Sequence, residues 1–203
     1  ILSYGRNEYK NGIKEFNKAI KLDPNNVDYV YNRGLAYYNL ENFENALKDI
    51  SKAIVLNPNE ADYFFYRGIS YVFLRKQKEA IKDFNKAIKL NPKEAKYFYE
   101  KGYSYYRLNK NKEAIKEFNK AIKLDPNNVD YVYNRGLAYY YLENHENALK
   151  DAEQIIKLDP KNAEYFNFRG RILSYGRNEY KNGIKEFNKA IKLDPNNVDY
   201  VYN

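Results

Sequence analysis

The 203-residue sequence contains no cysteine, no methionine, no tryptophan and a single histidine. Without cysteine the chain has no disulfide, no thiolate ligand and no cysteine nucleophile. One histidine, His145, is too few for a histidine-based zinc site, and its neighbours Glu143 and Glu146 place it in a turn between two helices. No apolar run approaches the ~18 residues of a membrane span, and no signal peptide is visible. We therefore expect a cytoplasmic protein that does not insert into membranes.

Motifs that carry catalysis are also missing. We find no glycine-rich phosphate loop, no metal-ligand spacing and no nucleophile placed in helical register with a base. The many Asp and Glu residues recur with the repeat at helix ends, where the helix dipole and solvation account for them. The sequence therefore predicts a protein that is not an enzyme and that uses no cofactor and no metal.

Prolines divide the chain into equal parts. Each proline follows Asp or Asn after an apolar run, and proline ends a helix because it lacks an amide hydrogen and clashes with the preceding turn. The intervals are 34 residues four times and then 35, with prolines at Pro24, Pro58, Pro92, Pro126, Pro160 and Pro195. The chain is therefore a tandem repeat, and the apolar face of each copy must be buried against the next copy.

Each repeat contains two stretches with the period of a helix. In repeat 27–60, Val30, Gly34 and Tyr37 mark the buried face of a first helix, and Ala46 and Ala53 mark that of a second. Gly34 and Ala46 are small, which indicates that the two helices approach closely there. The pattern predicts helices over 27–40, 44–57, 61–74, 78–91, 95–108, 112–125, 129–142, 146–159, 163–175 and 181–194.

The repeats resemble tetratricopeptide repeats. That family has an aromatic residue, Leu-Gly, Tyr, Ala, Phe and a closing Pro in 34 residues. The matching residues are Phe64, Gly68, Tyr71, Ala80, Phe84 and Pro92, and then Phe98, Gly102, Tyr105, Ala114, Phe118 and Pro126. The resemblance implies an all-α, right-handed superhelical solenoid of stacked antiparallel helix pairs. We expect one array over 1–203, with repeats 1–26 (partial), 27–60, 61–94, 95–128, 129–162, 163–197 and 198–203 (partial).

The chain departs from the family pattern at several positions. The expected leucine is replaced by a basic residue, whose aliphatic stem should cover apolar surface while its charge reaches water or an acid. These residues are Arg33, Arg67, Lys101, Arg135 and Arg169. In repeat 129–162, Ala152 replaces the expected aromatic residue and Ile155 replaces the expected alanine, so the total side-chain volume is roughly conserved. The extra residue of repeat 163–197 is expected in the turn 176–179, and that repeat carries Gly183 where others have Ala.

The resemblance also implies that one face of the first helices lines a concave groove that holds partner peptides or helices. Aromatic residues dominate this face, and they are favoured at interfaces because they bury large areas at low entropy cost. An alternative for any single aromatic residue is packing between adjacent repeats. The expected groove residues are Asp28, Tyr31, Asn32, Leu35, Tyr38, Asn39, Asp62, Phe65, Tyr66, Ile69, Phe73, Lys96, Tyr99, Glu100, Tyr103, Tyr106, Arg107, Asp130, Tyr133, Asn134, Leu137, Tyr141, Glu164, Asn167 and Phe168.

An acidic column runs along the same face. It comprises Asp28, Asp62, Asp130, Glu164 and Asp199, and only Lys96 interrupts it. Acidic residues also favour a helix N-terminus, which explains part of the column. If the column serves binding, ligands should be neutral or basic and carry apolar side chains.

Two other functions are consistent with the sequence. Residues 1–32 repeat at 172–203, so the chain ends with the start of a first helix and opens with the finish of one. Opposite ends of two copies could therefore stack head to tail into open filaments. Electrostatic binding of nucleic acid by the convex face is the third reading, since the net charge is +8. A solubilising role explains this lysine face better, and nucleic acid is not expected as a partner. The lysines are Lys14, Lys18, Lys21, Lys48, Lys52, Lys82, Lys86, Lys89, Lys116, Lys120, Lys123, Lys150, Lys157, Lys185, Lys189 and Lys192.

Overall fold

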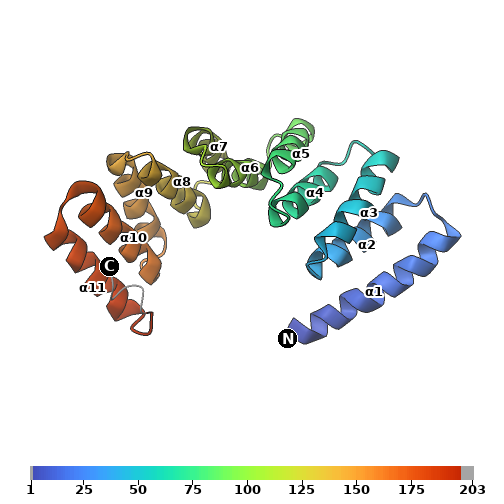
Figure 1. Cartoon of the computed structure of the whole chain (residues 1–203), viewed down its shortest axis with the longest axis horizontal. Coiled ribbons are helices and arrows are strands. Elements are labelled where there is room, and N and C mark those ends of the chain that lie inside the picture. Colours follow the sequence, from blue (N-terminus) through green and yellow to red (C-terminus); the bar gives the residue numbers. More distant parts are fainter. Residues whose placement is uncertain (1, 198–203) are drawn as a thin grey trace. The chain divides into compact units, whose positions relative to one another are not determined.

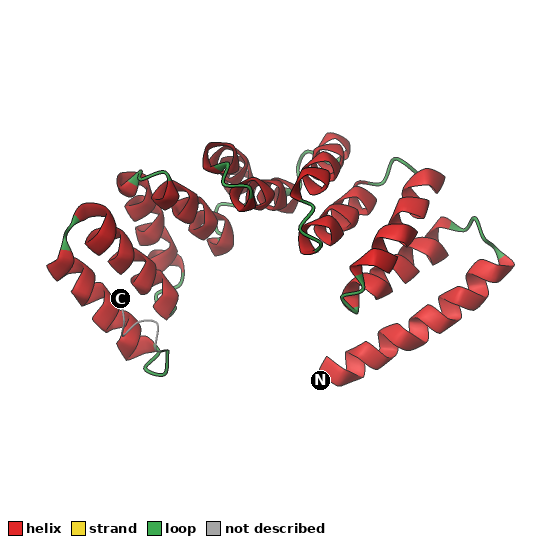
Figure 2. Cartoon of the chain, viewed as in Figure 1, coloured by secondary structure: helices red, strands yellow, loops and turns green. Residues whose placement is uncertain are grey.

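The computed structural model describes residues 2–197, and within that range it contains helices and turns but no strand (Figures 1 and 2). The all-α prediction is therefore confirmed. From the second helix onward, each predicted boundary lies within about one residue of the observed one, the bulged helix after Ala163 excepted. The helices are α1 (Leu2–Leu22), α2 (Val27–Asn39), α3 (Phe43–Leu56), α4 (Ala61–Phe73), α5 (Gln77–Leu90), α6 (Ala95–Arg107), α7 (Asn111–Leu124), α8 (Val129–Tyr141), α9 (His145–Leu158), α10 (Ala163–Arg171), the π-helical turn η1 (Ile172–Gly176) and α11 (Tyr180–Leu193).

Short polar residues set the helix ends. The side chain of Asn26 accepts hydrogen bonds from the backbone amides of Asp28 and Tyr29, which satisfies donors at the start of α2. Each second helix ends two residues before its proline, as α3 does at Leu56 before Pro58. His145 was expected in a turn but is the first residue of α9, where its ring meets that of Tyr140 edge to face.

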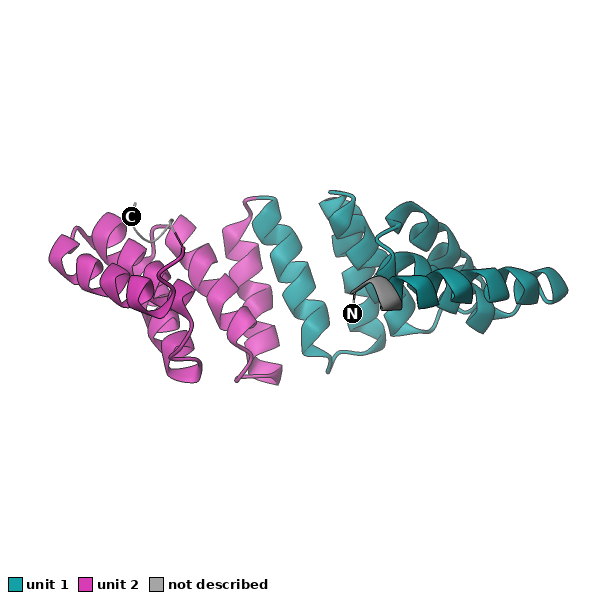
Figure 3. Ribbon diagram, turned by 90° about the horizontal axis from the view of Figure 1, so that it is seen from below, with its two compact units in different colours: residues 1–108 teal, residues 109–203 magenta. Residues whose placement is uncertain are grey.

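The chain forms two compact units, residues 1–108 and residues 109–203 (teal and magenta in Figure 3). In unit 1, α2 packs against α3 and α4 against α5, while α1, α3 and α5 contact the helix that follows. In unit 2, α8 packs against α9 and α10 against α11, and α7 contacts α8. Consecutive helices thus bury each other's apolar faces, and the grouping of both units into one array stays a prediction.

The two helices of a repeat approach most closely at a glycine of the first helix. A methyl group added to Gly68 would lie 2.6 Å from Cε1 of Phe84, which is fully buried. At Gly34 the corresponding distance to Cγ1 of Ile50 is 2.9 Å. The expected close approach in repeat 27–60 is confirmed, with Ala46 fully buried. Glycine costs about 1 kcal/mol of helix propensity, and the close packing offsets that cost.

The arginine before each of these glycines ties three helices together. The guanidinium of Arg67 donates to both carboxylate oxygens of Asp83 at 2.7 Å, and it also donates to the hydroxyl of Ser51 in the preceding repeat at 3.2 Å. Arg33 and Arg135 make the same two contacts with Asp49 and Asp151, and with asparagines of the preceding repeat. For Arg33, Arg67 and Arg135, the charge expected to reach water or an acid therefore reaches an acid.

The exchange of Ala152 and Ile155 is compensated by the next repeat. Both side chains are fully buried. Because Ala152 is small, the ring of Phe168 occupies the space beside Gly136. A methyl group added to Gly136 would lie 3.1 Å from Cε1 of Phe168. Phe168 is 1% exposed and belongs to the core cluster of unit 2. The volume is thus filled by a residue that the sequence pattern assigned to the groove.

The extra residue of repeat 163–197 lies inside the helix, so its expected position in the turn 176–179 was wrong. Residues Ile172–Gly176 form a π-helical turn, which holds one more residue than an α-helical turn. The connection that follows has the same length as in the other repeats, with Asn178 in the left-handed region (φ 58°) like Glu41 and Arg75. The π turn brings Ser174 against α11, where a methyl group on Gly183 would collide with the Ser174 hydroxyl. This contact explains why that position is glycine and not alanine.

Identical sequences adopt two structures in this chain. Residues 2–22 form one continuous helix, α1, whereas the same letters at 173–193 form most of η1, a turn and α11. In the second copy α10 packs on α11, and Phe187 lies against Gly170. The equivalent Phe16 is only half-buried, because within the described residues α1 has no such first helix. The partner helix therefore selects the hairpin over the continuous helix.

Replacing Gly68 by alanine should destabilise unit 1 by about 1–3 kcal/mol, because the new methyl group overlaps a fully packed ring. Gly12→Ala is the matched control, since its methyl group meets only Cε2 of Phe16 at 3.8 Å. That variant should gain up to about 1 kcal/mol from helix propensity. Chemical denaturation followed by circular dichroism measures both changes, and equal effects of the two substitutions would contradict the close approach.

Asp83→Asn should lower the free energy of unfolding by about 1.5–3 kcal/mol, because it leaves the Arg67 guanidinium without its charged acceptor. Asp83 is only 6% exposed, so water cannot easily replace the lost carboxylate. Adding Arg67→Met should restore most of that loss, since the unpaired charge is then gone. A double-mutant cycle in urea measures the coupling. Additive effects of the two substitutions would show that the ion pair does not join the helices.

Candidate functional site

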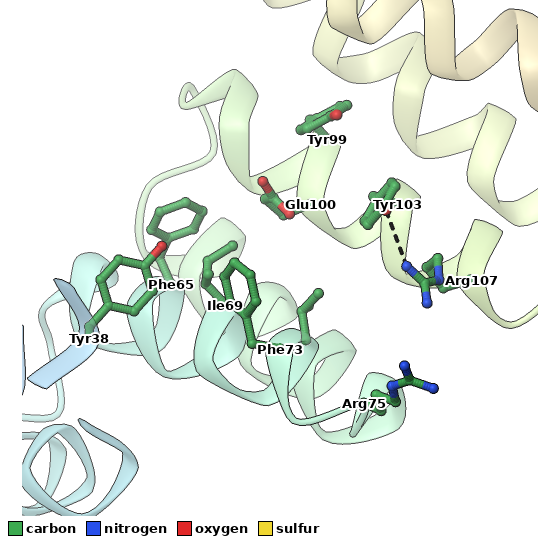
Figure 4. Close-up of a pocket in the computed structure, with 10 residues that line it drawn as sticks. Tyr38, Phe65, Ile69, Phe73, Arg75, Tyr99, Glu100, Tyr103 and Arg107 are labelled. Atoms are coloured by element: carbon green, nitrogen blue, oxygen red, sulfur yellow. Dashed lines mark hydrogen bonds between the residues drawn. The ribbon is translucent and has the colours of Figure 1, made fainter. Parts of the chain in front are cut away.

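A pocket of about 480 Å³ opens on one face of the first helices of unit 1 (Figure 4). We call this side of α2, α4 and α6 the first-helix face. The pocket is lined by Tyr38 from α2, by Phe65, Ile69, Val72 and Phe73 from α4, by Arg75 from the following turn, and by Tyr99, Glu100, Tyr103 and Arg107 from α6. The helical period places the α4 and α6 residues on one side of each helix. Eight of these ten are among the expected groove residues, and Val72 lies on the same predicted face of α4, which leaves Arg75 unpredicted.

Glu100 is an acidic residue among apolar and aromatic walls. It is half-buried, and Figure 4 shows its carboxylate between Tyr99, Tyr103 and Ile69. No described residue donates a hydrogen bond to this carboxylate or forms a salt bridge with it. Desolvation raises the pKa of Glu100 from its ordinary value to about 7. Near neutral pH, the Glu100 carboxyl group is therefore present in both its ionised and its neutral form.

The other charges of the pocket are basic and lie toward one end. Arg107 donates a hydrogen bond to the Tyr103 hydroxyl at 3.3 Å, and Arg75 projects from the turn between α4 and α5 (Figure 4). Burial, with the nearby Glu100 carboxylate second, raises the pKa of Tyr38, so this phenol stays neutral. The pocket therefore presents an acidic centre, a basic end and aromatic sides.

Arg75 is the pocket residue that sequence reasoning missed. It occupies the left-handed position of the turn (φ 58°), which other repeats fill with Glu41, Asn109, Glu143 and Asn178. Turn residues vary between repeats and follow no helical period. Their alignment across repeats is the signal that could have identified Arg75.

The predicted groove residues differ in accessibility. Those exposed are Asp28, Asn32, Asn39, Asp62, Phe73, Arg107, Asp130 and Tyr141. Those half-buried are Tyr31, Leu35, Tyr38, Tyr66, Lys96, Tyr99, Glu100, Tyr103, Tyr106, Tyr133, Asn134, Leu137 and Glu164. Those buried are Phe65, Ile69, Asn167 and Phe168, of which the first two still line the pocket while Phe168 lies in the core.

Several predicted residues join adjacent repeats. In unit 1 the ring of Tyr31 packs 4.4 Å from that of Tyr63, between α2 and α4. In unit 2 the Tyr133 hydroxyl donates to Glu164 at 3.1 Å, and the amide of Asn167 donates to the other oxygen of the same carboxylate at 3.3 Å. The packing role weighed for single aromatic residues therefore applies to Tyr31 and Tyr133.

The acidic column is partly engaged within the protein. Asp62 accepts a hydrogen bond from the Tyr97 hydroxyl at 2.8 Å and lies 3.7 Å from the ammonium of Lys96. Charge reversal at Asp62 would therefore disturb packing between α4 and α6, so it is a poor test of binding alone. Asp28 and Asp130 are exposed, and Asp199 lies outside the described residues.

Among residues 2–197, no group of three or more His, Asp or Glu side chains is arranged to hold a metal ion. In the same part of the chain, no helix has both the length and the apolar character required to cross a membrane.

Family models match the chain along most of its length. A TPR repeat model matches residues 3–41, 76–109 and 102–143. Tetratricopeptide repeat models match residues 27–60, 129–162 and 163–197. No curated protein sequence matches this chain.

Solved structures of repeat proteins share this fold. The structure of YrrB, a TPR protein with an unusual peptide-binding site, aligns with a TM-score of 0.78 and 23% identity over 92% of this chain and 96% of that one. A MamA structure from Desulfovibrio magneticus RS-1 aligns with a TM-score of 0.80 and 21% identity over 83% of this chain and 95% of that one. The C-terminal part of a TPR repeat-containing protein from Cytophaga hutchinsonii aligns with a TM-score of 0.82 and 21% identity over 98% of this chain and 82% of that one. At these identities the likeness shows the solenoid fold.

Glu100→Gln should stabilise the protein at alkaline pH. The folded-state pKa of about 7 lies above the ordinary 4.5, so the folded state binds more protons between these values. The free energy of unfolding therefore falls as pH rises from 4.5 to 7, and above pH 7 the full cost of the charge remains. With allowance for partial exposure, the variant should gain about 1–3 kcal/mol at pH 8 and little at pH 4.5.

The measurement is urea denaturation at both pH values, with Glu79→Gln as the control because Glu79 is exposed on the neighbouring α5. The control should shift stability equally at both pH values. A gain for Glu100→Gln that does not depend on pH would show that Glu100 is not desolvated.

Proposed function

Because this chain belongs to the tetratricopeptide repeat family, we propose that it is a non-catalytic interaction protein that holds a partner peptide on the first-helix face of unit 1. The observation that carries the proposal is the pocket, since three successive first helices contribute to it. A ligand on this face would contact all three helices at once. YrrB, which has the same fold, has a peptide-binding site, and this supports the assignment.

The chemistry of the pocket suits a peptide. Phe73 is 58% exposed, and its ring stacks on Phe43 at 4.4 Å, so an apolar surface is held rigid and open to solvent. Rigid aromatic surface gains burial on binding at low entropy cost. The carboxylate of Glu100 and the guanidinium of Arg107 add polar contacts that can fix the register of an extended chain.

Head-to-tail self-association and nucleic-acid binding are weaker candidates. The ends expected to meet include residues 1 and 198–203, which lie outside the described residues. On the lysine face, several lysines pair with a glutamate on the same helix, as Lys150 does with Glu146 at 2.7 Å and Lys189 with Glu186 at 3.0 Å. Such pairing leaves less positive charge for phosphates. A steep salt dependence of affinity would indicate nucleic acid, and concentration-dependent light scattering would indicate self-association.

Phe73→Ala should weaken the binding of peptide ligands selected on the intact protein by about tenfold or more, since an exposed aromatic anchor is lost. The control is Val55→Ala on α3, where an equally apolar side chain is 82% exposed but lies outside the pocket. Fluorescence anisotropy with labelled peptides measures both affinities. Equal affinities of Phe73→Ala and the wild type would place the binding site elsewhere.

A further inference from the structure

Glu100 is the one acidic side chain of the pocket, and the fold does not require it. The equivalent positions in the other repeats are Asn32, Tyr66, Asn134 and Phe168. Three of these serve the protein itself: the amide of Asn134 donates to the carbonyl of Asp130, Phe168 fills the core, and Tyr66 packs on the core of unit 1. The Glu100 carboxylate has no such role within the described residues.

A partly buried carboxylate without a partner lowers stability unless a ligand compensates it. Charge complementarity therefore indicates what the ligand brings to this position. A positively charged group would restore the interactions that the carboxylate lost on leaving water, and charge-assisted hydrogen bonds are roughly twice as strong as neutral ones.

We propose that this pocket selects extended peptides by a lysine or arginine side chain that binds Glu100, followed or preceded at three residues' distance by an acidic side chain that binds Arg75 and Arg107. This inference rests on the proposed function, because it specifies the ligand of the same face. The occupant is a segment of another protein with a basic and an acidic residue, separated by two positions.

The walls of the pocket favour a cation beside Glu100. Aromatic rings from three helices line it, namely Tyr38, Phe65, Phe73, Tyr99 and Tyr103. Cations are attracted to ring faces within about 6 Å, and the ammonium of Lys96 already lies 4.9 Å from the Phe65 ring. Lys96 lies one turn before Glu100 on α6, and its ammonium is paired with Asp62 of α4.

The spacing of the two ligand charges follows from helix geometry. Glu100 and Arg107 are seven residues apart on α6, which corresponds to about 10 Å along the helix axis. An extended peptide advances about 3.3 Å per residue, so the same distance spans about three residues. Arg75 lies at the same end as Arg107 and can share the acidic side chain (Figure 4).

Binding of the cation should be linked to protonation of Glu100. The titratable and charged residues that line the pocket with Glu100 are Tyr38 from α2, Tyr99, Tyr103 and Arg107 from α6, and Arg75 from the turn; the lining residues of α4 are apolar. Desolvation raises the pKa of Glu100 to about 7, so this carboxyl ionises between pH 6 and pH 8. Affinity should therefore rise from pH 6 to pH 8 as the carboxyl ionises.

The test screens the full chain against a positional library of acetylated, amidated nonapeptides by affinity selection at pH 8. Bound peptides should be enriched in Lys or Arg and in Asp or Glu three positions away. Anisotropy titrations of the strongest peptide then compare wild type, Glu100→Gln and the control Glu79→Gln. Glu100→Gln should bind about tenfold or more weakly, consistent with a lost charge-assisted hydrogen bond, and the control should match the wild type.

Two further measurements separate binding from folding. A version of the strongest peptide with norleucine in place of its basic residue should bind the wild type at least about tenfold more weakly. It should also bind wild type and Glu100→Gln equally. The rise in affinity from pH 6 to pH 8 should be present in the wild type and absent in Glu100→Gln.

The outcomes distinguish this inference from the proposed function. Selected peptides that depend on Phe73 but show no preference for a basic residue would overturn the inference and leave peptide binding on this face intact. Basic peptides whose binding is unaffected by both Phe73→Ala and Glu100→Gln would overturn both, as would a library from which no peptide is retained.

Discussion

The contact between each glycine of a first helix and the side chain opposite it on the second helix sets the geometry of the repeats. Gly68 admits the ring of Phe84, and the preceding Arg67 reaches past this contact to Asp83 and Ser51. Dispersion contacts hold the helix pair at short distance, while the arginine fixes its rotation and joins it to the preceding repeat. Apolar packing alone allows sliding, whereas a bidentate ion pair has a defined geometry. The same combination recurs at Gly34 and Arg33.

This arrangement leaves the opposite side of the first helices free to vary. Positions such as Asn32, Tyr66 and Glu100 are equivalent in the repeat but differ in chemistry, because the close approach is made by other residues. In unit 2 the same position is used for packing, by Phe168, which replaces the volume missing at Ala152. The pocket around Glu100 thus lies on a face whose residues differ between repeats, and we propose a ligand as the partner of its carboxylate.

Helix positions could be predicted closely because proline, asparagine caps and a 34-residue period all act locally. The errors occur where tertiary contacts decide. Residues 2–22 form one helix, whereas the identical sequence at residues 173–193 forms a hairpin because α10 packs on α11. The π turn at Ile172–Gly176 also leaves no periodic signature. For the site, eight of the predicted groove residues line the pocket, whereas Arg75 lies in a turn outside any helical period.

The central claim is that ligands bind the first-helix face of unit 1 around Glu100. Amide chemical-shift mapping by nuclear magnetic resonance tests it most directly, with a peptide that carries a lysine and an aspartate three positions apart. We predict the largest perturbations on α2, α4 and α6, in particular at residues 99–107 and at Arg75, with little change on α3 and α5. Perturbations concentrated on α3 and α5, or in unit 2 alone, would contradict the account.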